Sequence, residues 1–340
     1  MRQRQVVTIH GINTDGEWQE MAKCVFGPHF ECLNLKYPHY RRFGALKLLV
    51  HLPSLLVGLT TCLVPWMILS WVGINTDKWI WALLGGTVLA VSHGIAHSHR
   101  RRAVDYIDRE LSRKMGTRPP DFIGHSLGTY LCGTLLLRAE YRRFNRMILA
   151  GCVLPTKYPW KQLNASGRKA CREVQNEVGK RDLVVWIAFA LHGWVGQFGQ
   201  AGYRGFRAKD GTVHNLKGPY DACRYCDGET AALVHNIDHP EVGHSDLFIT
   251  PEYCDSFWFP FLLEIHPSEY REFSDLCIEA ANLEIDDPKH ELPLLIAVFF
   301  EERWEWADGT VADALRKELR KLVGNKMNTS NVESIVDTIL

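Results

Sequence analysis

Short apolar runs rich in β-branched residues alternate with helix-forming segments through the first two thirds of the chain, and this alternation limits the fold more than any other feature. Strand–helix–strand units of this kind form right-handed crossovers, which place their strands parallel in one sheet. We therefore expect an α/β fold with a mostly parallel sheet and helices on both faces. The predicted strands are 5–10, 31–37, 121–125, 146–152, 172–178 and 231–237, and the predicted helices include 103–115, 127–143 and 183–191.

Composition excludes several classes of protein. Lys+Arg and Asp+Glu number 39 each, so no net basic charge favours a nucleic-acid partner. The ten cysteines are dispersed, mostly in apolar segments such as those around Cys62, Cys132 and Cys152. This is typical of buried thiols in a reducing compartment rather than of a disulfide framework. The N-terminal sequence MRQRQVVTIHG has no long apolar run and no cleavage site, so a cleaved signal peptide is not expected.

One long apolar segment interrupts the alternation. Residues 48–72 contain no Asp, Glu, Lys or Arg and a single histidine, His51, and after a polar interval residues 79–96 are apolar again. A membrane-spanning helix needs about 20 apolar residues, so the first stretch is long enough and the second is marginal. Tryptophans cluster around the polar interval and arginines flank both ends, as at the interfaces of membrane helices. These residues are Trp66, Trp71, Trp79, Trp81, Arg41, Arg42, Arg100, Arg101 and Arg102.

We interpret residues 45–97 as an inserted apolar hairpin that crosses a membrane twice and leaves both its ends in the cytoplasm. The protein would then be associated with an inner or plasma membrane, with its main domain on the cytoplasmic side. The alternative is a pair of buried helices, or an apolar lid, in a soluble cytoplasmic protein. Pro53, Pro65 and Gly85-Gly86 favour that alternative because they weaken both stretches as regular helices.

The chain divides after residue 250. Residues 1–250 contain every predicted strand and form the expected α/β domain, in which 45–97 is an insertion. Beyond them the pattern is mainly helical, with amphipathic segments at 267–284 and 311–323. We expect residues 251–340 to form a C-terminal helical region that packs on the α/β domain.

The motif Gly124-His125-Ser126-Leu127-Gly128 lies between a predicted strand and a predicted helix. A serine hydroxyl becomes a useful nucleophile only when its oxygen is held exposed and a base removes its proton. A sharp strand-to-helix turn exposes the oxygen, requires small residues on either side, and points a helix N-terminus at the reacting centre. The alternative is that the small residues only permit close packing of helix on strand. In this context we favour Ser126 as a catalytic nucleophile.

Four segments resemble the lipase and serine-esterase branch of the α/β-hydrolase superfamily: VVTIHGINT, DFIGHSLGTYL, NEVGKRDLVV and GHSDLF. The resemblance covers about residues 5–43 and 100–248. It implies cleavage of an ester through an acyl-enzyme by a serine, a histidine and an acid, without a cofactor or a metal. Together with the membrane hairpin it indicates a lipid-like ester as the substrate. The alternatives are a thioesterase, a peptidase, or a membrane-tethered interaction module that has the fold without the activity.

The resemblance also implies an oxyanion hole, in which two backbone N–H groups bind the negatively charged oxygen of the intermediate. The amide of Ile12, in the segment His10-Gly11-Ile12, and the amide of Leu127 would supply these donors. Without the serine motif, His10-Gly11 would indicate only a turn that ends a strand. The residues expected to shape the turn around the nucleophile are Gly124, His125 and Gly128.

The acid should follow the serine and precede the histidine, which is the order in this fold. Asp182 comes after the predicted strand 172–178, where similar hydrolases have an asparagine–glycine–aspartate pattern that is matched by Asn176, Gly179 and Asp182. As an alternative, Asp182 would serve only as the N-cap of the helix at 183–191. The reserve candidates for the acid are Glu177 and Asp210.

We assign the base to His244, which lies in a loop beyond the last predicted strand, where this fold places its histidine. His239 is the competing candidate, and an ordinary loop histidine is the alternative. Cys223-x-x-Cys226 followed by His235 and His239 has the outline of a zinc site. The spacing between the two pairs is shorter than in the usual finger, and His235 falls in a predicted strand, so no metal is expected.

Overall fold

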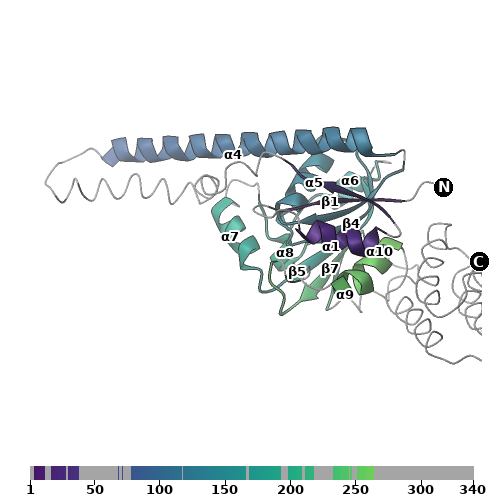
Figure 1. Ribbon diagram of the computed structural model, residues 1–340. Coiled ribbons are helices and arrows are strands. Elements are labelled where there is room, and N and C mark those ends of the chain that lie inside the picture. Colours follow the sequence, from purple (N-terminus) through teal and green to yellow (C-terminus); the bar gives the residue numbers. More distant parts are fainter. Residues whose placement is uncertain are drawn as a thin grey trace, which may run out of the picture.

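Parallel strands form a central sheet with the order β2-β1-β3-β4-β5-β7-β6 (Figure 1). The inner strands β3 and β4 are buried along almost their whole length, as expected when helices cover both faces of a parallel sheet. The predicted α/β class with a mostly parallel sheet is therefore confirmed. The strands are β1 (Gln5–Ile9), β2 (Glu31–Leu35), β3 (Asp121–His125), β4 (Phe144–Ala150), β5 (Cys171–Gly179), β6 (Val213–Leu216) and β7 (Val234–His239).

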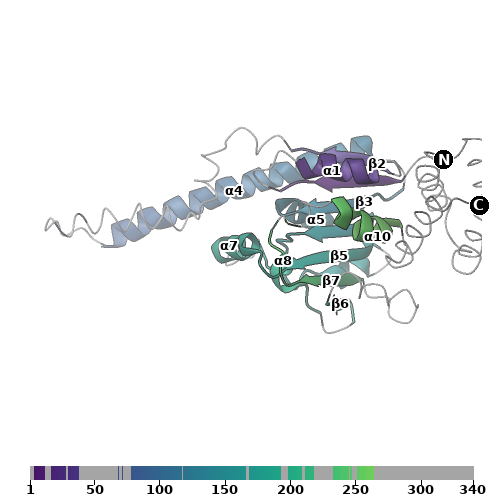
Figure 2. The ribbon, with the colours of Figure 1, turned by 60° about the horizontal axis from the view of Figure 1, so that its bottom comes forward.

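Helices lie on both faces of the sheet. Helices α4 and α5 cover one face, and α1 with the segment from α9 to α10 covers the other (Figure 1, Figure 2). A π-helical turn at Cys254–Trp258 joins α9 to α10. The helices are α1 (Glu17–Phe26), α4 (Lys78–Lys114), α5 (Leu127–Arg138), α6 (Trp160–Asn164), α7 (Leu183–His192), α8 (Ala201–Arg204), α9 (Pro251–Tyr253) and α10 (Phe259–Leu263).

The structure is a computed structural model that describes part of the chain. It comprises residues 4–11, 17–27, 30–37, 68, 71, 78–116, 118–165, 168–192, 198–208, 211–217, 233–244, 246 and 251–263. Most of the predicted insert before residue 78 and the amphipathic segments at 267–284 and 311–323 therefore lie outside it. The first residues of the predicted C-terminal region, 251–263, pack on the sheet face beside α1.

Helix α4 packs through its C-terminal half. Val104, Ile107 and Leu111 are fully or almost fully buried, and their spacing of three and four residues places them on one face of the helix. They belong to the same apolar core as Phe122 of β3 and Leu131 of α5. The face predicted from the sequence is thus the buried face.

The N-terminal half of α4 extends beyond the edge of the sheet (Figure 1, Figure 2). The sequence pattern predicts an apolar stretch at 79–96 and a separate helix at 103–115, but one continuous helix spans both. No proline falls between residues 78 and 114, and a glycine inside a helix costs only about 1 kcal/mol, so Gly85-Gly86 does not end the helix.

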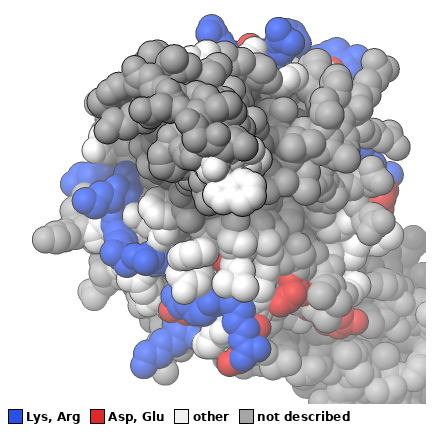
Figure 3. Space-filling view, turned by 90° about the vertical axis from the view of Figure 1, so that its left-hand side faces the viewer, with Lys and Arg blue, Asp and Glu red and all other residues white. Residues whose placement is uncertain are grey.

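The predicted membrane hairpin is not confirmed. Among the helices of the described residues, none combines the length and the apolar character needed to cross a membrane. Membrane association stays a prediction. Viewed from the side toward which α4 extends, the surface carries several clusters of Lys and Arg and fewer Asp and Glu side chains (Figure 3).

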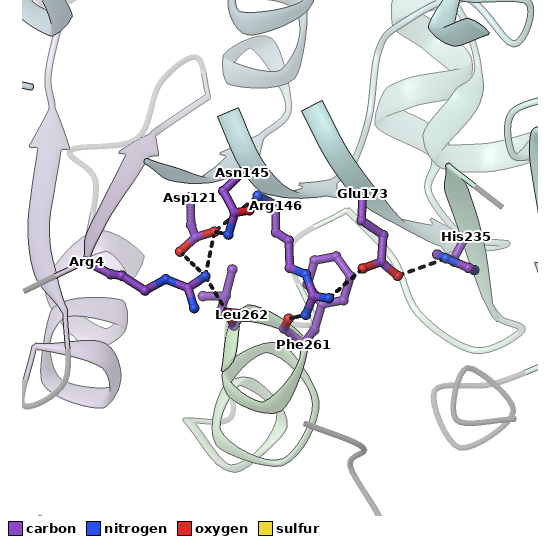
Figure 4. A network of polar contacts seen from close by, with 8 residues as sticks. All are labelled: Arg4, Asp121, Asn145, Arg146, Glu173, His235, Phe261 and Leu262. Atoms are coloured by element: carbon purple, nitrogen blue, oxygen red, sulfur yellow. Dashed lines mark hydrogen bonds and ion pairs between the residues drawn. The ribbon is translucent and has the colours of Figure 1, made fainter. Parts of the chain in front are cut away.

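A buried ion pair connects α10 to the amino ends of the strands (Figure 4). Arg4 Nη2 lies 3.0 Å from Asp121 Oδ2 and donates at 2.8 Å to the carbonyl oxygen of Leu262. Asn145 Nδ2 and the Arg146 amide donate to Asp121 Oδ1 at 2.9 and 3.1 Å. Burial raises the pKa of Asp121, although the Arg4 charge opposes that change.

Arg146 makes the second attachment. Its guanidinium donates to the carbonyl oxygen of Phe261 and pairs with Glu173 at 2.9 Å (Figure 4). Glu173 in turn lies 3.0 Å from Nε2 of His235. The carbonyl oxygens of Phe261 and Leu262 thus accept hydrogen bonds from Arg146 and Arg4, and these contacts hold α10 against the sheet.

Candidate active site

The carboxyl ends of β1 and β3 are the place where this sheet can hold a ligand. These neighbouring strands continue in opposite directions across the sheet, β1 toward β2 and β3 toward β4. In open α/β sheets the connections that leave two such strands part from one another, which opens a crevice at their carboxyl ends. His10 and Gly11 follow β1, and Ser126 follows β3, so the two predicted segments lie at the carboxyl ends where sheets of this topology bind ligands.

Ser126 has a strained backbone between its strand and its helix. Its φ of 53° and ψ of −121° are unusual for a residue other than glycine, and such conformations cost about 1–3 kcal/mol. Surrounding hydrogen bonds hold it: the Ser126 amide donates to the Ala150 carbonyl at 2.9 Å. Thr129 donates to the Ser126 carbonyl through its amide at 3.0 Å and through its hydroxyl at 2.7 Å. The chain turns sharply enough here to leave the serine side chain partly exposed.

The small residues around Ser126 permit close contacts. A Cβ atom on Gly128 would lie 2.3 Å from the carbonyl oxygen of Ile9, so only glycine lets α5 begin this close to the end of β1. A Cβ on Gly11 would lie 2.8 Å from Cβ of Ser126, and one on Gly124 would lie 2.6 Å from the Phe122 ring. The predicted need for small residues thus has a steric cause.

The predicted acid and the predicted base are in contact. Nδ1 of His244 lies 2.8 Å from Oδ2 and 3.0 Å from Oδ1 of Asp182. Asp182 is buried, and its Oδ1 also accepts a hydrogen bond of 2.9 Å from the amide of Val185 in the first turn of α7. Asp182 therefore caps α7 and also contacts the imidazole of His244.

His244 lies above the end of β4, beside the serine motif. A Cβ atom on Gly151 would lie 2.8 Å from Cε1 and 2.9 Å from Nδ1 of His244, so the ring occupies the space that this glycine leaves open. Its centroid lies 4.7 Å from that of His125, the residue before Ser126. Among the hydrogen bonds of the described residues, none joins His244 to Ser126. The structure therefore brings the predicted acid and the predicted base together near the serine motif, and no hydrogen bond of the described residues joins them to Ser126.

His125 binds the backbone of His244. Its Nε2 lies 3.0 Å from the His244 carbonyl oxygen. Burial, followed by the nearby His244 and His10, lowers the pKa of His125 to about 3. The imidazole is therefore neutral near pH 7, and Nε2–H donates to the carbonyl. The sequence indicated for His125 only a part in shaping the turn, so this contact is an addition from the structure.

One of the two predicted oxyanion donors can be placed. Helix α5 begins at Leu127, whose amide belongs to the first turn, where N–H groups have no partner within the helix. Ile12 lies outside the described residues. The preceding segment is held by Tyr37, whose hydroxyl lies 3.0 Å from the carbonyl oxygens of both His10 and Gly11. The Tyr37 ring stacks on His10 at 4.6 Å, a contact that the sequence did not reveal.

Glu177, a reserve candidate for the acid, is bound elsewhere. His239 Nε2 lies 2.6 Å from its Oε2, and the Tyr253 hydroxyl lies 3.1 Å from the same oxygen. Trp258 Nε1 and Gln175 Nε2 donate to Oε1 at 2.6 and 2.7 Å. These contacts occupy both carboxylate oxygens and also the competing base His239. Glu177 and His239 therefore bind one another and not the Asp182–His244 pair.

The remaining alternatives lie mostly outside the described residues. These include the second reserve acid, Asp210, and the cysteines of the zinc-like pattern, Cys223 and Cys226. The described histidines of that pattern pair with acids, His235 with Glu173 and His239 with Glu177.

No protein-family model matches the chain, and no curated protein matches its sequence. Among solved structures the chain is similar to a YdeN-like hydrolase from Pectobacterium atrosepticum, with 14% sequence identity and a TM-score of 0.33. That similarity covers 79% of this chain and 92% of the other. The fold class therefore rests on the strand order and parallel register of the chain itself.

Proposed function

We propose that the protein is a serine hydrolase that cleaves an ester bond through an acyl-enzyme. The observation that carries this proposal is the strained Ser126, at the start of a helix, beside an imidazole that a buried carboxylate orients. Strain at a single residue is expected where the fold holds a reacting group in place. An acid paired to a histidine beside such a serine has the composition of a nucleophilic site.

The proposed reaction begins with proton transfer from Ser126. Its hydroxyl turns toward Nε2 of His244, which accepts the proton as the oxygen attacks the ester carbonyl. Asp182 accepts a hydrogen bond from Nδ1–H and stabilises the imidazolium. The imidazolium then returns the proton to the leaving alcohol, and a water molecule, activated by the same histidine, releases the acid and restores the serine.

Backbone donors would stabilise the charge that develops on the carbonyl oxygen. The Leu127 amide lies at the N-terminus of α5, where the helix dipole also favours negative charge. The Ile12 amide is the second donor in this proposal. Mutations that remove one such donor in other enzymes cost about 3–4 kcal/mol of transition-state stabilisation.

An apolar surface beside the site supports a lipid-like ester as substrate. Helix α7 begins directly after Asp182, and its side chains Leu183, Trp186 and Ile187 are 66%, 46% and 48% exposed. Val184 and Phe189 add to the same exposed surface. Contiguous apolar side chains on a protein surface mark binding sites for apolar ligands, membranes or proteins. We propose that this surface faces the apolar part of the substrate at a membrane.

The second candidate is a membrane-tethered interaction module with this fold and no activity. The observation that favours it is that His244 and Ser126 are not hydrogen-bonded to each other. A thioesterase or a peptidase would use the same groups, since the proposed triad does not recognise the leaving group.

Labelling with a fluorophosphonate probe separates these functions. We expect wild-type protein to be labelled, Ser126→Ala to lose the label, and Ser112→Ala, a serine of α4 bound to Asp108, to keep it. A panel of esters, thioesters and amides then identifies the bond that is cleaved. If folded wild-type protein is labelled no more than Ser126→Ala, the hydrolase proposal is wrong and the inactive module is favoured.

A further inference from the structure

The segment at the end of β4, residues 150–153, contacts both Ser126 and His244. The amide of Ser126 donates to the carbonyl oxygen of Ala150 at 2.9 Å. The next residue is Gly151, and the ring of His244 occupies the space that a side chain at this position would fill. Ser126 and His244 therefore lie against adjacent residues of one segment, although the first follows β3 and the second follows β7.

Hydrogen bonds from another part of the chain hold segment 150–153 in place. The amide of Gly199 donates to the carbonyl oxygen of Val153 at 2.8 Å, and the amide of Gly202 donates to that of Cys152 at 2.7 Å. A Cβ atom on Gly202 would lie 2.3 Å from the amide nitrogen of Cys152, so the two backbones are in close contact. The segment therefore gives the groups that lie against it a fixed position.

The hydroxyl of Thr129 joins the turn at Ser126 to the same segment. Thr129 is fully buried in the first turn of α5, and its Oγ1 donates at 2.7 Å to the carbonyl oxygen of Ser126. The same hydroxyl oxygen accepts a hydrogen bond of 3.1 Å from the amide of Val153. Both backbone groups of Ser126 are thus connected to residues 150–153, the amide directly and the carbonyl through Thr129. A strained residue keeps its conformation where its surroundings fix it in this way.

We propose that Thr129 is a positioning residue that sets the separation between the Ser126 hydroxyl and the His244 imidazole. This inference rests on the proposed function, because it assigns a role within that site. Thr129 acts through its two contacts with the backbone. Loss of its hydroxyl breaks the link to Val153, so the turn and segment 150–153 can shift relative to one another. A displacement of about 1 Å between reacting groups can lower a rate about a hundredfold.

The first experiment compares two substitutions of Thr129 in the full-length protein. Thr129→Val keeps the shape of the side chain and removes the hydroxyl, whereas Thr129→Ser keeps the hydroxyl and removes a buried methyl group. Both should destabilise the fold. We expect Thr129→Val to lower kcat for an ester about tenfold or more with KM changed less than about twofold, and Thr129→Ser to keep kcat within about twofold. Thr134→Val, at a half-buried threonine of α5, is the control and should keep the wild-type kcat.

The second experiment does not require hydrolysis. Ser126→Cys places a thiol at the nucleophile position, and the rate of alkylation of the peptide that contains it, measured over a pH series, gives the pKa of that thiol. A nearby imidazolium lowers the pKa of a thiol from its ordinary value of about 8.5. We expect a lowered pKa in Ser126→Cys, alone and combined with Thr129→Ser. Combination with Thr129→Val should raise this pKa by about one unit.

Three results would overturn the proposal. These are equal kcat values for Thr129→Val and Thr129→Ser, a thiol pKa that Thr129→Val leaves unchanged, and an ordinary thiol pKa in Ser126→Cys with Thr129 intact. The hydrolase proposal fails separately. If the wild type cleaves no ester and reacts with no fluorophosphonate, but the thiol pKa responds to Thr129→Val, the protein is not a hydrolase and Thr129 still positions the two groups.

Discussion

Nε2 of His125 lies 3.0 Å from the carbonyl oxygen of His244, so the residue before the proposed nucleophile holds the backbone of the proposed base. The two residues are 119 positions apart in the sequence. The contact connects the turn after β3 with the loop after β7, and it fixes the position of His244 independently of Asp182. A hydrogen bond from a neighbouring residue to the backbone of a catalytic group fixes the position and orientation of that group.

Removal of this contact should reduce activity without abolishing the fold. We expect His125→Leu to lower kcat/KM for an ester substrate about tenfold, which corresponds to the loss of one buried hydrogen bond. His125→Gln, whose amide can reach the same carbonyl, should recover part of the loss. Equal kcat/KM for His125→Leu and wild type would show that the contact does not position His244.

Stability should depend on pH through His125. Its pKa is lowered to about 3 in the folded protein, against about 6.5 for an unperturbed histidine. Between these values the unfolded chain binds a proton that the folded protein does not, so stability rises with pH across this window and is lost as pH falls. The loss should approach about 1.4 kcal/mol per pH unit below pH 6.

Urea unfolding at a series of pH values tests this dependence. His125→Gln, which has no titrating group at this position, should have a flatter stability profile between pH 4 and pH 6.5 than the wild type. An identical profile for the two proteins would assign the acid sensitivity to other groups.

Gly151→Ala should displace His244. The added Cβ would lie 2.8 Å from its ring, and Gly151 also has a φ of +55°. Gly211→Ala is the matched control, because Gly211 has a φ of +77° but an added Cβ would have no atom of the described residues within 4 Å. Both variants should lose about 1 kcal/mol of stability, but only Gly151→Ala should lose activity, by about a hundredfold. Equal losses of activity would contradict the proposed place of His244.

The two roles of Asp182 can be separated. Asparagine and serine cap helices as well as aspartate does. The free energies of unfolding of Asp182→Asn and Asp182→Ser should therefore lie within about 1 kcal/mol of the wild-type value. Neither can stabilise an imidazolium on His244, and kcat should fall by a factor on the order of ten thousand. Glu177→Gln provides the comparison, as it alters the reserve acid. If Glu177→Gln lowers kcat more than Asp182→Asn at equal stability, the acid is misassigned.

The exposed surface of α7 should determine the preference for apolar esters. Trp186→Ser and Ile187→Ser should each lower kcat/KM for long-chain esters by about tenfold or more, since a large side chain contributes about 1.5–3 kcal/mol when buried by a ligand. Short-chain esters should be cleaved at the wild-type rate. Leu137→Ser, at an exposed leucine of α5, is the control. A uniform effect on all chain lengths would exclude α7 from substrate binding.

Sequence patterns predicted the centre of the sheet because its strands are apolar on both faces. β1, β3 and β4 come from such runs, whereas β5 buries the polar residues Gln175, Asn176 and Glu177. β6 was missed, since its residues Val213–Leu216 form a mostly half-exposed edge strand with two polar members. α1 was also missed, although Trp18, Ala22 and Phe26 recur every four residues and are buried, so that signal was present.

The candidate site was predictable only where it is local in sequence. The serine motif is continuous, and the order of serine, acid and histidine narrowed the choice of Asp182 and His244. The contacts of Tyr37 with His10, and of Gly151 with His244, join distant segments. Which residues meet in these contacts depends on the register of neighbouring strands, and the sequence pattern of a single strand does not reveal that register.

The attachment of residues 251–263 to separate parts of the sheet determines how short a recombinant fragment can be. A chain cut after residue 250 would leave the buried Glu177 without its hydrogen bonds from Tyr253 and Trp258. It would also remove the buried side chains of Phe259 and Leu262 and expose the apolar surface that they cover. A protease that removes this segment should therefore release an unfolded product, whereas trimming beyond residue 263 leaves these attachments in place.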